Sequence, residues 1–106
     1  MADRIKVIIK RPGEQIGHMT HIANTVESFQ NHVGGYYEEI HIGSNEVMIV
    51  NEEGKLRGLP KNFRVGINFP DFIRGTAIIC GKSGSGYSDV PFDLHFWQTL
   101  LTKWKN

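Results

Sequence analysis

The segment 75–83 comes closest in this chain to a catalytic motif, because it contains Gly-Lys-Ser at its end. A phosphate-binding P-loop has four residues between its first glycine and Gly-Lys-Ser, so that backbone N–H groups and the lysine hold the phosphates. Here five residues intervene, and four of them are apolar, which favours a strand over a loop. Gly84 and Gly86 also oppose the helix that must follow the lysine. The sequence therefore argues against a nucleotide hydrolase.

The glycine- and serine-rich stretch 82–88 is a second candidate for a functional site. Its backbone N–H groups, one lysine and nearby hydroxyls could form an anion-binding nest. A signalling nucleotide or a similar small anion would then contact this stretch together with two adjacent tyrosines. The alternative is a mobile surface loop that binds nothing. The candidate ligand-binding residues are Tyr36, Tyr37, Lys82, Ser83, Ser85 and Tyr87.

Histidine, cysteine and glutamate side chains are the remaining groups that could do chemistry. The pair His18-x-x-His21 lacks the neighbouring cysteine or carboxylate cluster that would complete a zinc site. Cys80 ends an apolar run, where a cysteine is usually a small buried hydrophobe rather than a nucleophile. Glu38 and Glu39 are adjacent, so they point to opposite faces of a strand and are poorly placed as an acid–base pair. We predict no catalytic residue, no metal site and no cofactor.

The charge pattern bears on the class of partner. The formal net charge is +1, from 12 basic and 11 acidic residues, and the two signs are interspersed. A nucleic-acid binder would need Lys55, Arg57, Lys61 and Arg64 to converge on one face. No apolar run approaches the roughly 20 residues that cross a bilayer, and the first residues lack the apolar stretch of a secretory signal. Together with a single cysteine, this predicts a cytoplasmic protein in a reducing compartment.

Apolar periodicity predicts the elements that must position these groups. Alternating and β-branched residues predict strands over 4–10, 15–22, 36–42, 46–51 and 76–80. Shorter continuations are predicted for 56–59 and for an edge strand within 61–70. Helices are predicted over 22–33 and 91–104, where apolar residues recur every three or four positions. The stretch 81–89 is predicted to be a flexible loop.

This element order is typical of one compact α+β domain. The 106 residues have the length of a single domain, so residues 1–106 are predicted to fold as one unit. We expect a curved, mainly antiparallel sheet of about four to six strands, with both helices packed on one face.

The last predicted helix carries more large apolar residues than one core-facing stripe needs. If Phe96 and Leu100 face the core, part of a second stripe lies in solvent, and an exposed aromatic stripe marks a partner contact. The alternative is that this second stripe packs in the core. The candidate interface residues for a homo-oligomer or a protein partner are Trp97, Leu101 and Trp104.

Three segments occur together in a familiar order: 33–38 (VGGYYE), 51–60 (NEEGKLRGLP) and 75–81 (GTAIICG). Over about residues 22–82, the chain resembles a family of small uncharacterised proteins, a domain of unknown function found in Gram-positive bacteria, their plasmids and their phages. The resemblance implies a cytosolic accessory protein of a phage or mobile element, and such elements carry many small proteins that block host components.

The leading hypothesis for the function is a non-enzymatic binding protein that blocks or sequesters a host component, for example in counter-defence. Its partner would be a host protein or a small anionic, nucleotide-like ligand. Two alternatives remain: a nucleic-acid-binding accessory protein, and an enzyme whose active site uses Cys80 or a histidine pair in a pocket.

Overall fold

The computed structural model describes residues 3–64 and 72–104, without the side chains of Lys103 and Trp104. The elements in chain order are β1 (Arg4–Lys10), β2 (His18–Ala23), α1 (Val26–Val33), β3 (Tyr37–His41), β4 (Glu46–Asn51), β5 (Lys61–Phe63), β6 (Ile73–Arg74), β7 (Ala77–Ser83), β8 (Gly86–Ser88) and α2 (Leu94–Trp104). Within these described residues, no helix has the length and apolar character that crossing a membrane requires.

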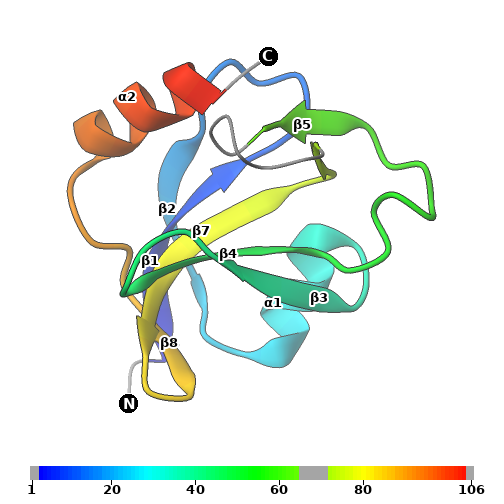
Figure 1. Cartoon of the computed structure of the whole chain (residues 1–106). Helices are drawn as coiled ribbons and strands as arrows, with labels where there is room; N and C mark the ends of the chain where they lie inside the picture. The colour runs from blue at the N-terminus through cyan, green and yellow to red at the C-terminus, as the bar shows by residue number, and fades with distance from the viewer. Residues whose placement is uncertain (1–2, 65–71, 105–106) are drawn as a thin grey trace.

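The main sheet is open and antiparallel, with the strand order β2-β1-β7-β4-β3 and with β8 paired to β7 (Figure 1). The short strands β5 and β6 form a separate two-stranded sheet. Two hairpins, β1–β2 and β3–β4, therefore meet on either side of β7, which comes late in the chain. The α+β class and the strand number predicted from the sequence are confirmed.

Strand β7 occupies the middle of the sheet and is buried on both faces. Ile78 pairs with Ile9 on one side and Ile49 on the other, and Ile79 pairs with Ile8 and Met48. Because successive side chains of a strand point to opposite faces, these two rows of three belong to opposite sides of the sheet. A strand buried on both sides is uniformly apolar, as residues 77–80 of β7 are.

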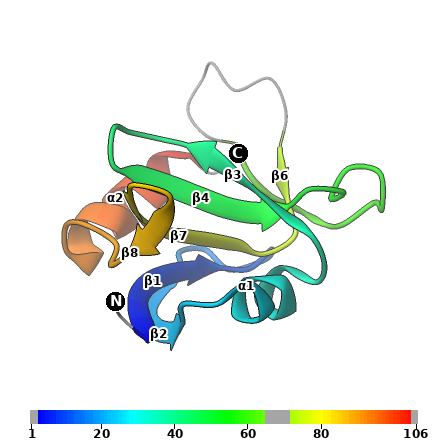
Figure 2. The ribbon, with the colours of Figure 1, turned by 90° about the horizontal axis from the view of Figure 1, so that it is seen from below.

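The two helices cover opposite faces of the sheet, so their predicted placement on one face is wrong. Phe29 and Val33 of α1 pack with Ile78 and its neighbours, whereas Trp97 of α2 packs with Ile79 and its neighbours. In Figure 1 the sheet lies between α2 above and α1 below, and Figure 2, seen from below, brings α1 to the front. The physical reason is that both faces of β7 are apolar, and each needs its own cover.

Helix α1 begins at Val26, four residues later than predicted. The Thr25 hydroxyl accepts a hydrogen bond from the Ser28 N–H at 3.1 Å and so caps the first turn. Ile22, expected in the helix, instead belongs to β2 and pairs with Ile5 of β1. Gly34 ends the helix in the left-handed conformation, with φ of 81°, which glycine adopts without a side-chain clash.

A buried lysine ties the segment between β4 and β7 to the first strand. Lys10 is 2% exposed, and its ammonium donates to the Glu14 carbonyl and to Asn62 Oδ1, both at 2.7 Å. Asn62 in turn donates to the carbonyls of Lys10 and Gly75. Burial lowers the pKa of Lys10, and the nearby Glu14 opposes that shift.

The segment between β4 and Asn62 differs in part from the prediction made from the sequence. Residues 52–58 form turns rather than a continued meander, and Leu56 is exposed. The predicted edge strand within 61–70 is present as β5 over its first three residues. The rest of that prediction falls on 65–71, outside the described residues.

The predicted flexible loop 81–89 is mostly strand. β7 continues to Ser83, and a tight turn leads into β8, which pairs with it from Gly81–Ser88 to Ser83–Gly86. At Gly81 a Cβ atom would lie 2.5 Å from both the Asp89 carbonyl and the Ser88 hydroxyl, so only glycine allows this approach. The pairing of β7 with β8 occupies backbone N–H groups that the predicted anion-binding nest required.

Helix α2 packs its second apolar stripe in the core, which is one of the two alternatives that the sequence left open. Trp97 is 1% exposed and Leu101 0%, whereas Phe96 is 42% exposed. The Trp97 indole donates to the Pro91 carbonyl, and the Asp93 carboxylate caps the helix by accepting from the Phe96 N–H. The prediction of an interface at Trp97 and Leu101 is therefore wrong, because both side chains fill the core. The side chain of Trp104 lies outside the described residues.

Replacing Trp97 with alanine is expected to lower the free energy of unfolding by about 3–5 kcal/mol, because a buried ring is lost and a cavity remains. The matched variant Phe96→Ala, one residue away on the exposed side, is expected to lower it by less than about 1 kcal/mol. Urea denaturation followed by far-ultraviolet circular dichroism measures both changes. Equal losses in the two variants would contradict this orientation of α2.

Candidate functional site

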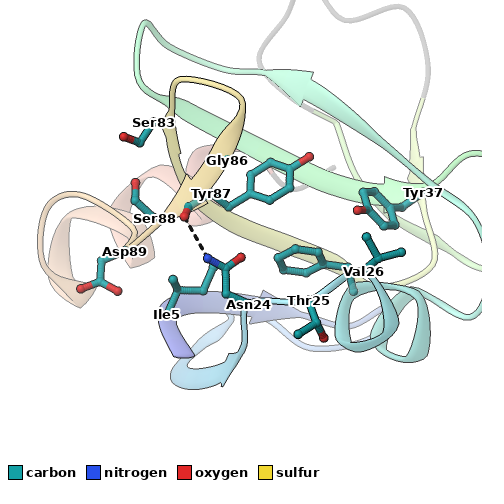
Figure 3. A pocket seen from close by; sticks show the side chains of 11 residues that line it. Ile5, Asn24, Thr25, Val26, Tyr37, Ser83, Gly86, Tyr87, Ser88 and Asp89 are labelled. Carbon is teal, nitrogen blue, oxygen red and sulfur yellow. Dashed lines mark hydrogen bonds between the residues drawn. The ribbon is translucent and has the colours of Figure 1, made fainter. Parts of the chain in front are cut away.

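A groove of about 750 Å³ opens on the α1 face of the sheet, between α1 and the β7–β8 hairpin (Figure 3). It lies where the short helix α1 leaves that face uncovered. Its lining residues come from four parts of the chain that are far apart in sequence: Ile5, Asn24, Thr25, Val26, Phe29, Tyr37, Ser83, Gly86, Tyr87, Ser88 and Asp89.

Three aromatic rings contribute to the apolar part of the groove, together with Ile5 and Val26. The Phe29 ring is almost fully buried, and the rings of Tyr37 and Tyr87 meet it edge to face, with centroids 5.6 and 5.1 Å away. Figure 3 shows the two tyrosines entering the groove from β3 and β8. Edge-to-face contacts of this kind stabilise the ring positions beyond simple burial. The arrangement offers a fixed aromatic surface to a molecule in the groove.

The turn between β2 and α1 holds one side of the groove in place. Asn24 donates its side-chain N–H to the Tyr87 carbonyl at 3.1 Å, which joins this turn to β8 (Figure 3). The Asn24 backbone N–H donates to the Asp3 carbonyl at 3.0 Å. Since Thr25 caps α1 at the same point, helix, turn and hairpin are fastened together, and the groove keeps its shape without a ligand.

A polar cluster beside the groove centres on Glu39. Its Oε1 accepts from the Tyr87 hydroxyl at 2.8 Å and from the Lys82 ammonium at 3.0 Å, and its Oε2 lies 3.3 Å from His41 Nε2. The Tyr87 hydrogen bond, aided by Lys82, lowers the pKa of Glu39 against the opposing effect of its burial. The side chains of Glu39 and Lys82 reach across β4, which lies between their strands.

The same cluster affects the two groove tyrosines. Burial, then the hydrogen bond to Glu39 and its charge, raise the pKa of Tyr87. Burial and the Glu39 carboxylate also raise the pKa of Tyr37, although Lys82 acts in the opposite direction. Both hydroxyls therefore carry their protons at neutral pH.

Cys80 is a buried free thiol on this face of the sheet. Burial, with a smaller effect of the Glu39 charge, raises the pKa of the thiol to about 12, and Lys82 opposes the shift. A thiol is a nucleophile only as the thiolate. Cys80 therefore stays protonated at neutral pH.

The predicted ligand-binding residues divide into three groups in the structure. Tyr37, Ser83 and Tyr87 line the groove. Lys82 lies next to it, but its ammonium is bound by Glu39 and stands 4.7 Å from the centre of the Tyr87 ring. Tyr36 is 69% exposed, and neither it nor Ser85 lines the groove. The two adjacent tyrosines separate because neighbouring positions of an extended chain point to opposite sides.

Several groove residues were not predicted from the sequence as site residues. Asn24, Thr25 and Phe29 were placed only within the predicted helix over 22–33. Glu39 was weighed only as one of two adjacent carboxylates, and Asp89 was not considered. Their joint role depends on strand order, so a local pattern could not reveal it.

The histidine pair and the basic residues named from the sequence can also be placed in the described residues. His18 and His21 lie on β2 three positions apart, which places them on opposite faces. Across residues 3–64 and 72–104, no group of three or more histidine, cysteine or acidic side chains could hold a metal ion. Lys61 and Arg64 both stand over the Phe72 ring, whereas Arg57 donates to the Gly34 carbonyl.

Above about pH 9 the free energy of unfolding is expected to fall, and Cys80 contributes to the fall. The pKa of a cysteine thiol in an unfolded chain is about 8.5, whereas the fold raises the pKa of Cys80 to about 12. Between these values the folded chain keeps a proton that the unfolded chain has lost, so stability is lost as the pH rises. For this one group the slope reaches up to about 1.4 kcal/mol per pH unit.

Urea denaturation at about pH 8 and about pH 10 tests this in the wild type and in Cys80→Ala. The variant should lose less stability between the two pH values than the wild type does. An equal loss in both proteins would show that the thiol is not protected from ionisation by the fold.

Comparisons with known proteins give one result. No curated protein and no solved structure matches the chain. A family model does match over residues 5–102, nearly the whole chain, and its description is "Domain of unknown function (DUF3846)". The match includes the strands from β2 to β8 and helix α1 in full, together with most of β1 and α2. The chain thus belongs to the DUF3846 family of domains of unknown function.

Proposed function

We propose that the protein is a non-enzymatic binding protein, which holds a small aromatic molecule in the groove between α1 and β8 and so sequesters it. The observation that carries the proposal is the set of three fixed rings, Phe29, Tyr37 and Tyr87, at an open groove of about 750 Å³. Ligand sites are typically concave, mostly apolar and largely preformed, with a few polar groups that set orientation.

The groove meets these requirements with its own residues. Ile5, Val26 and the three rings supply apolar surface, and Asn24, Thr25 and Ser88 supply polar atoms at the edge. The bonds from Asn24 to β8 and from Thr25 to α1 hold the walls before any ligand arrives. A site that is already ordered loses less conformational entropy on binding, which favours affinity.

Sequestration rather than catalysis fits the reactive groups that lie nearby. The Cys80 thiol is buried with a pKa of about 12, and Glu39 is engaged by Tyr87 and Lys82. A nucleophile or general base needs an available group of matched pKa within reach of the substrate. Neither side chain offers one to the groove.

The proposal extends to the setting that the family resemblance implies. We place the protein in the bacterial cytoplasm, as an accessory protein of a phage or mobile element that removes a host signal, for instance in counter-defence. The free thiol of Cys80 is in keeping with a reducing compartment. Native mass spectrometry of protein isolated from its own host would give the mass of a released cargo, and the same spectrum would show whether the protein is a monomer or a homo-oligomer.

Indole is a suitable first probe for the groove, because it is aromatic and uncharged. We expect a Kd on the order of 1 mM, as a fragment of this size allows. The backbone amide resonances of Tyr37 and Tyr87 should shift during a two-dimensional NMR titration. Tyr37→Ala should weaken binding by about fivefold, since one wall of the groove is lost.

Tyr36→Ala is the matched control, because it removes the neighbouring tyrosine, which lies outside the groove. A second groove variant, Val26→Asp, guards against misfolding: Val26 is 57% exposed, and an acidic residue suits the first turn of a helix. It should also weaken indole binding. If indole shifts no groove resonance, or if Tyr36→Ala weakens binding as much as Tyr37→Ala does, the proposal is wrong.

A further inference from the structure

We infer that the groove selects aromatic molecules that carry a positive charge and disfavours aromatic anions. This inference rests on the proposed function and adds the chemical class of the ligand. It replaces the small anionic ligand that the sequence suggested, and it follows from the charges around the groove and from the character of its rings.

The lining residues carry one formal charge, and it is negative. Among the eleven described lining residues, Asp89 is the one with a formally charged side chain. Its Oδ1 accepts from the Lys6 backbone N–H at 2.8 Å, which fixes the carboxylate at the groove while the side chain stays exposed. The Lys6 side chain does not neutralise it from within the groove, because Ile5, its neighbour on β1, is the residue that faces this side.

The cation that stands over the Tyr87 ring is already paired. Lys82 lies 3.0 Å from Glu39 Oε1, and it is not among the residues that line the groove. An anionic ligand would have to compete with Glu39 for this ammonium. In doing so it would approach the Glu39 carboxylate as well as that of Asp89. Glu39, Lys82 and Asp89 together carry a formal charge of −1.

The positive end of α1 does not reverse this balance. The helix begins beside the groove, and its first free N–H groups attract anions in principle. Here the Thr25 hydroxyl already accepts from the Ser28 N–H, and the first turn carries the carboxylate of Glu27. That carboxylate offsets the partial positive charge of the helix end.

The rings themselves favour a cation. The face of an aromatic ring is electronegative and attracts an ammonium or guanidinium group within about 6 Å. The Tyr87 ring already does this, because the Lys82 ammonium stands 4.7 Å from its centre. A positively charged aromatic molecule could therefore stack on the groove rings and place its charge toward Asp89.

Three indole compounds with the same ring and different charge test the inference: tryptamine is a cation, tryptophol is neutral and indole-3-acetate is an anion. NMR titration of the full chain with each compound, read at the amides of Tyr37, Tyr87 and Asp89, measures three dissociation constants. We expect tryptamine to bind about tenfold more tightly than indole-3-acetate, with tryptophol between them.

Asp89→Asn is the discriminating variant. Asparagine keeps an Oδ1 that can accept from the Lys6 N–H, so the hairpin should stay in place while the charge is lost. The difference between tryptamine and indole-3-acetate should shrink to about threefold or less, with tryptophol unchanged. Raising the salt concentration from about 50 mM to about 500 mM should shrink it in the wild type as well.

The outcomes distinguish a failure of the proposed function from a failure of the charge selection. If none of the three compounds shifts the groove resonances, the proposed function fails. If all three bind there, and indole-3-acetate binds as tightly as tryptamine or more tightly, the groove is a ligand site but the charge selection is wrong. If the preference for tryptamine survives unchanged in Asp89→Asn, the carboxylate assignment is wrong.

Discussion

The burial of β7 on both of its faces is the constraint on which the rest of the fold depends. Ile78 and Ile79 are each fully buried, and each is flanked by a large apolar side chain from β1 and from β4. A shift of the register by one residue would exchange the two rows between the faces and so mismatch both helices at once. The pairing of the two hairpins and the choice of face for α1 and α2 all follow from this one strand.

The groove arises from the unequal cover of the two faces. Helix α2 has 11 residues and α1 only 8, so the α1 face is closed partly by side chains from the strands themselves. Around Cys80, this face is closed by the side chains of Tyr37 and Tyr87 and by the Glu39–Lys82 ion pair. The tyrosines thus complete the core with one side of their rings and line a groove with the other.

Local patterns predicted the parts of the fold that local forces decide. Strand β4 was predicted with its observed ends, and the first helix was predicted with its observed last residue, Val33. When a helix carries two apolar stripes, the packing of the whole fold decides which stripe faces the core. For this reason Trp97 was named as an interface residue, although it packs in the core. Glu39 and Lys82 are 43 residues apart and meet only because of the strand order.

The place of β7 in the strand order also matters while the protein is being made. Synthesis proceeds from the N-terminus, so the β1–β2 and β3–β4 hairpins leave the ribosome before residues 77–83 exist outside it. During that interval Ile8, Ile9, Met48 and Ile49 belong to strands with an open apolar edge, which other chains can pair with. A pause in translation ahead of β7 would lengthen the exposure, whereas rapid completion of the chain shields both edges in a single step.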